Sequence, residues 1–237
     1  MEFYQRFAKY YDTIFPLDVK QVDFLQGHLI SAKHVLDLGC ATGEYTIALH
    51  SRGYQIKGLD LSQLIIEEAK KKADKLNLKD IFYLEDMQKL NEENMYDGMY
   101  SIGNTIVHLK SIEAIYETFK RCYRALKPKA TIILQMINYE RILEKDIHTL
   151  PPIQKPGVSL LRRYNFKLPL IDFNTTLMLD DEIIEHTTQL FPLTAQALVI
   201  ILKSIGFKAI QSFDGFSNQP YDKDTSYQLV MVAKKDE

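Results

Sequence analysis

The sequence predicts an α/β fold, a doubly wound and mainly parallel β-sheet that carries a small antiparallel β insertion. Three observations support this prediction. Over residues 34–137, short apolar runs alternate with amphipathic helical segments, as expected for parallel strands joined by right-handed crossovers with helices on both faces. Residues 138–190 contain strand-like runs with no helix between them. A helix and two further strands then complete the pattern.

The first half of the chain supplies five expected strands with helices between them. The strands are predicted at 34–38, 54–60, 81–87, within 96–104 and at 127–137. The helices are predicted at 44–53, 63–77 and 111–126. Gly53 is expected to stop the first of these helices, and Ser62 is expected to be the N-cap of the second.

The second half of the chain contains the insertion, predicted at residues 138–190 within a core domain of residues 1–137 and 191–237. Residues 151–157 are interpreted as a proline-rich loop, and strands are predicted at 158–168, 170–179 and 182–191, with a tight turn at Asp180 and Asp181. The helix 193–206 and the strands 207–216 and 225–235 return to the core domain, where the two strands are expected to pair antiparallel.

The composition argues against several classes of protein. The 237 residues include 29 basic and 31 acidic side chains, and the net charge of −2 gives no general attraction to nucleic acid or to an anionic membrane. Cys40 and Cys122 are too few for a disulfide framework or a cysteine-rich metal site. No apolar run reaches the roughly 18 residues of a membrane span. We therefore expect a cytoplasmic protein with no metal, nucleic-acid or membrane partner, while the oligomeric state stays open.

The turn Gly39-Cys40-Ala41-Thr42-Gly43 follows the first strand, where ligands of open α/β sheets usually bind. Without a ligand, its glycines would only make a tight turn. Asp60 ends the second strand, at a separation where an acid can hold both hydroxyls of a ribose. Asp86 ends the third strand, where its carboxylate could accept from an exocyclic amino group while Met87 lies against a flat ring. Together these features predict a pocket for an adenosine-like molecule.

A pyrophosphate is not expected in this pocket. The turn lacks the G-x-G-x-x-G arrangement of dinucleotide-binding proteins. It also lacks the lysine and the Ser or Thr of a phosphate-binding P-loop. An adenosine ligand without a pyrophosphate is therefore favoured.

Five segments resemble, in order and spacing, the motifs of class I S-adenosylmethionine-dependent methyltransferases. They are VLDLGCATG (35–43), GLD (58–60), LEDM (84–87), YDGMYSIGNTIVHL (96–109) and LKPKATIIL (126–134). The resemblance extends over nearly the whole chain and implies a Rossmann-like sheet of seven strands with an antiparallel last strand. Ala41 departs from the pattern D-x-G-x-G-x-G, in which glycine is more usual at that position, although alanine is also small.

The resemblance implies a set of contacts to the cofactor, S-adenosyl-L-methionine. Asp37 and the turn residues Gly39, Cys40, Ala41 and Gly43 are expected at the methionine part. Asp60 is expected at the ribose, and Asp86 and Met87 at the adenine. Gly103 and Asn104 are expected at the methyl group and the substrate, and Leu61 belongs to the same set of contacts. Residues 7–12 resemble a segment that folds over the cofactor in many small-molecule members, which makes Tyr11 a further candidate. Packing of an aromatic helix face on the core would explain Tyr11 equally well.

The acceptor is expected to be a small molecule. Methyltransferases that act on amino groups of nucleic-acid bases commonly carry an N-P-P-Y-like motif after the fourth strand, whereas this chain has I-G-N-T at 102–105. Residues 103–109 resemble the corresponding part of glycine and other small-molecule N-methyltransferases. The acceptor atom, whether N, O, C or S, stays open.

The insertion is the expected specificity element, because a sheet placed after the fifth strand would lie over the sulfonium end of the cofactor and exclude water. Its candidate substrate contacts are Arg162, Arg163, Tyr164 and His186. Strand alternation sends the two arginines to opposite faces, so at most one points into the cleft, where it could hold a carboxylate or phosphate. Surface arginines on a two-sided sheet are the alternative.

Methyl transfer from a sulfonium is an in-line displacement, so the protein mainly aligns the acceptor and sheds water. His108 follows the fourth strand and is the candidate general base if the acceptor arrives protonated. A capping or core histidine is the alternative role. Two other functions stay open: a regulator that binds S-adenosylmethionine without turnover, and a nucleotide-dependent oxidoreductase, against which the glycine pattern argues.

Overall fold

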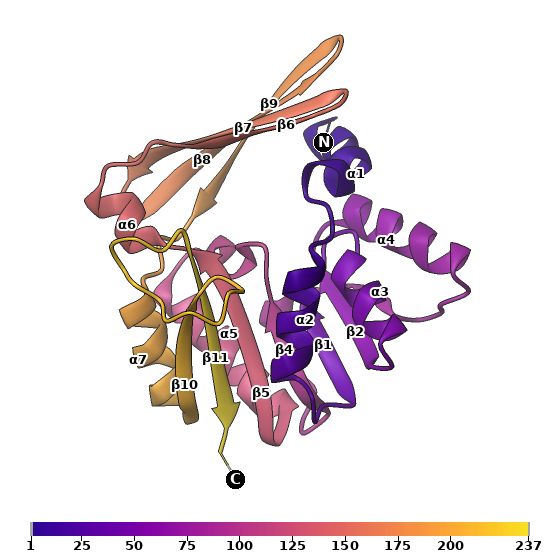
Figure 1. Cartoon of the computed structure of the whole chain (residues 1–237), viewed down its shortest axis with the longest axis vertical. Helices are drawn as coiled ribbons and strands as arrows, with labels where there is room; N and C mark the ends of the chain where they lie inside the picture. The colour runs from indigo at the N-terminus through magenta and orange to yellow at the C-terminus, as the bar shows by residue number, and fades with distance from the viewer. Residues whose placement is uncertain (1, 237) are drawn as a thin grey trace.

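The computed structural model, which describes residues 2–236, is organised around a seven-stranded sheet of order β10-β11-β5-β4-β1-β2-β3 (Figure 1). Its strands are β1 (His34–Leu38), β2 (Gln55–Asp60), β3 (Phe82–Leu84), β4 (Tyr96–Ser101), β5 (Leu126–Ile137), β10 (Phe207–Asp214) and β11 (Gln228–Lys235). Neighbouring strands pair in parallel except at β11, which runs antiparallel to both β5 and β10. The predicted doubly wound sheet with an antiparallel last strand is confirmed.

Helices connect these strands and cover the sheet. They are α1 (Glu2–Ile14), α2 (Val19–His28), α3 (Glu44–Ser51), α4 (Gln63–Lys75), α5 (Ile112–Ala125), α6 (Tyr139–Glu144) and α7 (Ala195–Ile205), with short 3-10 turns η1 (Met87–Lys89) and η2 (Thr105–His108). The Ser111 hydroxyl accepts a hydrogen bond from the Ala114 amide at the start of α5. Within residues 2–236, none of the helices has the length and apolarity that crossing a membrane requires.

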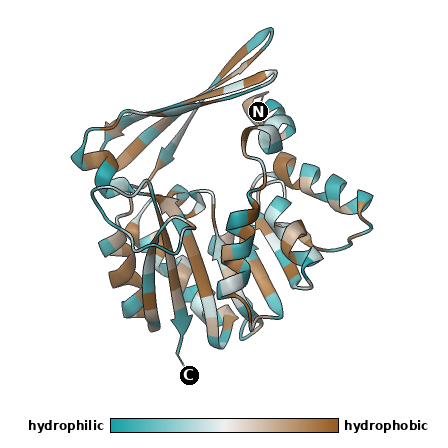
Figure 2. Ribbon diagram, in the orientation of Figure 1, coloured by the Kyte–Doolittle hydropathy of each residue, from teal (hydrophilic) through white to brown (hydrophobic). Residues whose placement is uncertain are grey.

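The two faces of the sheet are buried in separate apolar clusters. Leu36 of β1 and Met99 of β4 belong to the larger cluster, which also includes Phe119 of α5. The adjacent Val35 and Tyr100 belong to the second cluster, on the side of α2. Successive residues of a strand point to opposite faces, so strands buried on both sides are apolar throughout, and Figure 2 shows hydrophobic residues concentrated along them.

A second sheet, which we call the lid, has the order β6-β7-β8-β9 and lies beyond the carboxyl ends of the parallel strands (Figure 1). Its antiparallel strands are β6 (Thr149–Lys155), β7 (Val158–Lys167), β8 (Leu170–Leu179) and β9 (Glu182–Leu190). The loop predicted at 151–157 is wrong, because β6 occupies most of it. Pro151 and Pro152 are tolerated since β6 is an edge strand and its pairing with β7 shifts register between Leu150 and Ile153.

Two further segments differ from the prediction. β3 ends at Leu84 rather than at residue 87, because Asp86 turns the chain into η1 by accepting a hydrogen bond from the Gln88 amide. The short helix α6 was not expected between β5 and the lid. It begins where Asn138 Oδ1 accepts from the Arg141 amide at 3.0 Å.

Candidate functional site

The turn between β1 and α3 is held in a conformation that favours glycine. Gly39 and Gly43 have φ angles of 80° and 83°, a region that side chains strongly disfavour. A Cβ on Gly39 would lie 2.3 Å from Cγ2 of Thr105, and a Cβ on Gly43 would lie 2.2 Å from Cζ of Phe82. Ala41 also has a positive φ, of 49°. The turn therefore brings nearly bare backbone to the carboxyl end of β1.

Beneath this turn, the carboxylate of Asp37 is buried with one oxygen unused. Asp37 is 2% exposed. Its Oδ2 accepts hydrogen bonds from Thr46 Oγ1 at 2.6 Å and from the Tyr100 hydroxyl at 2.7 Å, whereas Oδ1 has no partner among the described residues. Burial raises the pKa of Asp37 to about 7, although those two hydrogen bonds act to lower it. An orphaned carboxylate oxygen of this kind is the complement of an ammonium group.

Asp60 adjoins the same turn from the end of β2. Its Oδ2 accepts from the Ala41 amide at 3.0 Å, and its Oδ1 accepts from the Ser62 amide at 2.9 Å. Burial raises the pKa of Asp60. Cys40 is buried nearby, while Leu61 is 71% exposed. A carboxylate offers about four lone-pair sites, so Asp60 can fix the turn and still accept from the two hydroxyls of a ribose.

Asp86 and Met87 lie farther along this edge of the sheet, after β3. The Glu85 amide donates to the Asp60 carbonyl at 3.0 Å, which holds the segment beside the end of β2. Asp86 is half-buried and caps η1 through the Gln88 amide at 2.9 Å. Met87 is also half-buried and packs against the larger core cluster. Both residues therefore follow directly after a residue held at Asp60, and both also have local structural roles.

Helix α1 is fastened to the glycine turn. The Thr42 hydroxyl donates to Asp12, and Lys72 of α4 forms an ion pair with Asp12 at 2.7 Å. Burial raises the pKa of Tyr11, and the carboxylate of Asp60 raises it further. Tyr11 is half-buried and lies within the electrostatic influence of Asp60.

The sequence did not identify Tyr4, whose pKa is raised by burial and also by the charge of Asp60. Tyr4, Phe7 and Tyr11 follow the i, i+3, i+7 spacing of one helical face. That spacing is the signal that could have identified Tyr4 together with Tyr11.

The end of β4 is tied to the entrance of the lid through Asn104. Its Nδ2 donates to the Tyr139 hydroxyl at 3.0 Å, and its Oδ1 accepts from the Ile137 amide at 3.0 Å. The amides of Gly103 and Asn104 both donate to Gln135 Oε1, at 2.7 and 3.1 Å. A Cβ on Gly103 would meet no described atom within 4 Å. Gly103 thus presents open backbone, whereas the side chain of Asn104 positions the chain.

His108, the candidate general base, lies at the end of η2 and is exposed. The surrounding protein atoms lower its pKa, and the charge of Lys110 adds to that effect. The adjacent Val107 carbonyl accepts from the Phe191 amide at 2.7 Å, directly after the last lid strand. A histidine that is neutral near pH 7 can accept a proton.

Register in the lid separates the two candidate arginines. Arg162 pairs with Thr175 of β8, which pairs with His186 of β9, so these side chains share one face. This is the inner face, because the ring of His186 stacks on Phe3 of α1 with centroids 4.9 Å apart. Arg163 belongs to the outer face and is exposed. Arg162, rather than Arg163, is therefore directed toward the main sheet.

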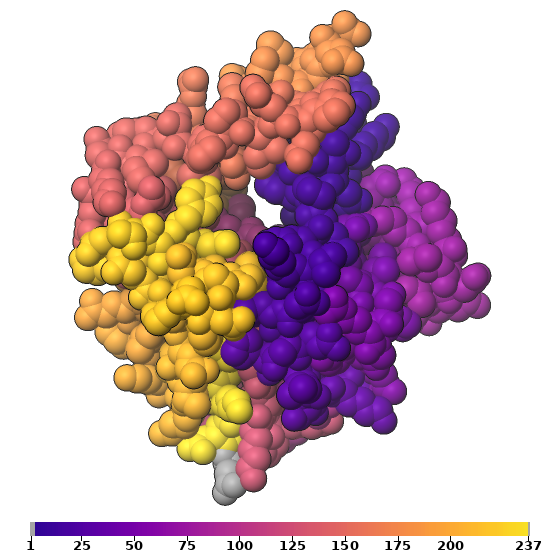
Figure 3. Space-filling view, viewed as in Figure 1, coloured from indigo at the N-terminus to yellow at the C-terminus, as the bar shows by residue number. Residues whose placement is uncertain are grey.

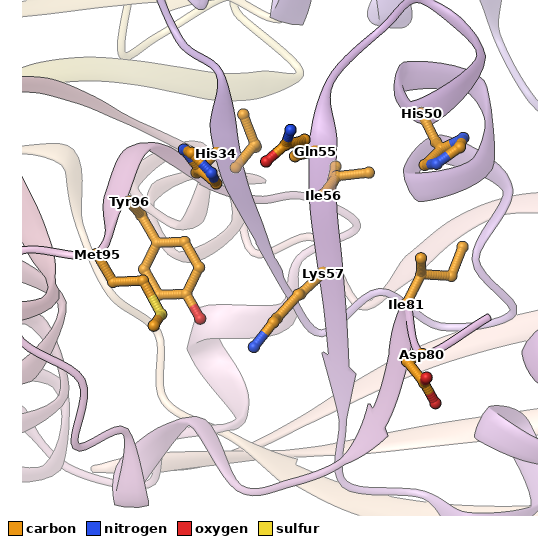
Figure 4. A pocket seen from close by; sticks show the side chains of 10 residues that line it. His34, His50, Gln55, Ile56, Lys57, Asp80, Ile81, Met95 and Tyr96 are labelled. Atoms are coloured by element: carbon orange, nitrogen blue, oxygen red, sulfur yellow. The ribbon is translucent and has the colours of Figure 1, made fainter. Parts of the chain in front are cut away.

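The opening of the molecule and two of its pockets lie on different sides. Figure 3 shows an opening between the lid, the N-terminal helices and the C-terminal segment. Two pockets, of about 330 and 800 Å³, lie instead at the amino ends of the parallel strands. The smaller pocket is lined by His34, Gln55 and Tyr96 among others (Figure 4). His34 pairs with Asp97 and Tyr96 with Glu92, each at 3.2 Å, so we assign this pocket no function.

The residues at the carboxyl edge fit S-adenosylmethionine. The unpartnered Oδ1 of Asp37 suits its ammonium group, and the remaining lone pairs of Asp60 suit its ribose hydroxyls. The bare backbone of the glycine turn lets both parts approach closely. This edge of the sheet is therefore the candidate active site.

Comparisons with known proteins agree with this fit. A family model described as a methyltransferase domain matches residues 35–129. YqeM of Bacillus subtilis, whose name places it among methyltransferases, is 28% identical over 145 residues, which are 60% of this chain and 58% of that protein. A glycine/sarcosine N-methyltransferase of Aphanothece halophytica is 26% identical over 217 residues, 86% of this chain and 77% of that one. The chain thus spans little more than half the length of YqeM.

Solved structures share the fold. An S-adenosylmethionine-dependent methyltransferase of Clostridium acetobutylicum superposes with a TM-score of 0.85 at 19% identity, and 99% of each chain is covered. The family model spans the strands β1 to β4 and the segments that follow them, where the ordered motifs and the unpartnered carboxylate oxygen also lie. Residues 35–129 of the chain therefore match a methyltransferase domain, and the whole chain shares the fold of a solved S-adenosylmethionine-dependent methyltransferase.

Proposed function

We propose that this protein transfers a methyl group from S-adenosylmethionine to a small-molecule acceptor. The observation that carries the proposal is the buried Oδ1 of Asp37, unpartnered within the described part of the chain, beneath a turn of nearly bare backbone. Similarity to a glycine/sarcosine N-methyltransferase over most of the chain supports a small acceptor.

We propose the following contacts to the cofactor. Asp37 accepts from the ammonium group, Asp60 accepts from the ribose hydroxyls, and Asp86 and Met87 adjoin the adenine. Tyr11 approaches the same site from α1. The proposed backbone and rim contacts are Gly39, Cys40, Ala41, Gly43, Leu61, Gly103 and Asn104.

The cofactor supplies a methyl group already activated on a sulfonium. The task of the chain is to align the acceptor with that group and to exclude water. The lid and α1 meet through contacts such as that of His186 with Phe3, so we propose that residues 138–190 act as a substrate lid on a domain of residues 1–137 and 191–237. If the acceptor is protonated, His108 is the proposed proton acceptor.

We further propose a cytoplasmic location. Cys40 and Cys122 are buried free thiols, and burial raises the pKa of each. Unpaired, unreactive cysteines suit a reducing compartment. The net charge of −2 favours neither nucleic acid nor membranes as partners.

Binding is the first test. We expect S-adenosylhomocysteine to bind in calorimetric titration and to raise the melting temperature, whereas NADH does neither. At a concentration about 100 times the Kd, the stabilisation is about 2.7 kcal/mol, which for a chain of this size corresponds to a shift of about 5–10 °C. Binding of NADH alone would instead identify a nucleotide-dependent oxidoreductase.

Turnover is the second test. S-adenosylmethionine with an isotope-labelled methyl group is incubated with amine, carboxylic acid and phenol acceptors, and the product is detected by its label. We expect transfer to one of these classes. Cofactor binding with no transfer to any acceptor would favour the regulator that binds without turnover.

A further inference from the structure

The inner face of the lid has a polar middle between two apolar ends. At one end, Leu160 and Leu177 pack in a cluster with α1. At the other end, Ile171 and Leu190 join the larger core cluster. Between them, two cross-strand rows consist of Arg162, Thr175 and His186, and of Tyr164, Phe173 and Thr188. We call these two rows the polar section of the lid.

Two hydrogen-bond donors in the polar section are buried, and the first of them is unused. Arg162 Nη2 donates to the Pro151 carbonyl at 2.9 Å, which fixes the guanidinium. The Nε of Arg162 is buried with no partner in the described part of the chain. Tyr164 is 3% exposed. Burial raises the pKa of Tyr164, and the adjoining hydroxyl of Tyr139 raises it further, but the two hydroxyls form no well-aligned hydrogen bond within residues 2–236. Buried donors without partners cost free energy, most of all on a charged group, so an external acceptor of hydrogen bonds is expected here.

The charge of the polar section selects the ligand. Burial lowers the pKa of His186, so its imidazole is neutral near pH 7. Arg162 is then the one cation among the six side chains of the two rows. A single guanidinium with a neighbouring hydroxyl donor matches the single charge of a carboxylate. A phosphate dianion would leave charge uncompensated in this buried setting.

We propose that the methyl acceptor carries a carboxylate, which Arg162 and Tyr164 bind. The proposal rests on the proposed methyl transfer and names its substrate class. The ring of Tyr164 lies 6.2 Å from that of Tyr139, and the Tyr139 hydroxyl accepts from Asn104 at 3.0 Å. Asn104 follows Gly103, whose backbone is open. An acceptor held by its carboxylate on the lid therefore presents its other end to the end of β4.

The test uses the full chain saturated with S-adenosylhomocysteine. Acetate, benzoate, their neutral amides and inorganic phosphate are titrated by calorimetry. We expect a carboxylate to bind, and the matching amide and phosphate to bind at least about tenfold more weakly. Arg162→Gln should weaken carboxylate binding by about tenfold or more. Arg163→Gln, the matched control on the outer face, should leave it unchanged.

The affinity for S-adenosylhomocysteine, measured for each variant, separates the possible failures. Four outcomes would overturn the carboxylate proposal and leave methyl transfer standing. They are equal binding of carboxylates and amides, a preference for phosphate, no carboxylate binding, and equal effects of Arg162→Gln and Arg163→Gln. An unaltered chain that does not bind S-adenosylhomocysteine would overturn both proposals. If Arg162→Gln loses that affinity as well, Tyr164→Phe decides, because it removes one hydroxyl only: weaker carboxylate binding supports the proposal, and unchanged binding overturns it.

Discussion

The carboxylate of Asp37 is fixed in position, but burial disfavours its ionised form. Thr46 and Tyr100 hold one carboxylate oxygen and leave the other without a partner among the described residues. Burial raises its pKa from 3.8 in the unfolded chain to about 7. The contribution of this group to stability is therefore full below about pH 4 and is lost as the pH rises through about 7. An ammonium group at the free oxygen would relieve that cost, which couples ligand binding to ionisation.

We predict that the affinity for S-adenosylhomocysteine increases as the pH rises through about 7 and then levels off. The cationic end of the ligand stabilises the ionised form of Asp37, so binding near or below that pH releases a proton. Calorimetry in buffers of different ionisation enthalpy measures this release. Asp37→Asn should bind more weakly and should lose the pH dependence around 7. A wild-type affinity that is flat across this range would contradict the assignment.

Asp60→Ala should weaken the binding of S-adenosylhomocysteine by roughly 1–3 kcal/mol. The substitution removes the proposed acceptor for the ribose hydroxyls and also frees the Ala41 amide that Asp60 now binds. Arg163→Ala is the control, since Arg163 is exposed on the outer face of the lid. Titration of both variants with the same ligand makes the comparison. A larger loss for Arg163→Ala would reverse the proposed roles.

At the scale of elements, one lysine links α1 to two helices of the main sheet. Lys72 pairs with both Asp12 of α1 and Glu44 of α3, at 2.7 and 2.6 Å. These pairs are partly exposed, so each contributes on the order of 1 kcal/mol or less. These ion pairs contribute little to stability and mainly position α1 over the end of β1.

Lys72→Met should loosen α1 without unfolding the sheet. We expect backbone hydrogen exchange across residues 2–14 to become a few-fold faster, with β1 and β4 unchanged, because α1 loses one of its attachments while the sheet keeps its pairing. Lys71→Met is the matched control, since Lys71 pairs within α4 with Glu68. Equal exchange in the two variants would show that α1 is held by its aromatic contacts instead.

The order of elements could be predicted from the sequence because alternating apolar patterns determine it locally. Strand β6 could not, since its two prolines indicate a loop unless the strand is known to lie at an edge. The position of Asp86 was predicted as the end of a strand, whereas its side chain caps η1. Local capping competes with strand extension, and the sequence does not rank the two.

The candidate site was predictable where residues follow strands in order, and not where it depends on tertiary contacts. Asp37, Asp60 and the glycine turn adjoin one another as the motifs imply. The choice between Arg162 and Arg163 needed the register of the lid, because alternation allows either face inward. The hydrogen bond of Asn104 to Tyr139 joins residues 35 positions apart, which no local pattern indicates.

At the scale of the whole molecule, the lid is held at both ends. One end joins the core of the main sheet, and the other is held on α1 by a separate apolar cluster that includes Phe3, Leu160 and Leu177. Separation of α1 from the lid therefore breaks that cluster and leaves the main core intact. We therefore expect the opening of Figure 3 to be able to widen without loss of the fold.

Leu177→Ala should destabilise the contact between lid and α1 by about 2–4 kcal/mol. Leu177 is fully buried in that cluster, whereas the adjacent Met178 is 37% exposed on the other face and supplies the control Met178→Ala. Hydrogen exchange should become faster in α1 and in β7 to β9, and should stay slow in β1, β4 and β5. Uniformly faster exchange would show that lid and sheet unfold as one unit.

The position of β11 determines when the molecule can fold during synthesis. Although β11 (Gln228–Lys235) is the last strand along the chain, it lies between β5 and β10. Until it leaves the ribosome, β5 presents an unpaired edge and β10 has no place in the sheet. The half of the sheet that carries the lid is therefore completed after translation of residue 235, and a nascent chain arrested earlier would expose an edge that invites aggregation or chaperone binding.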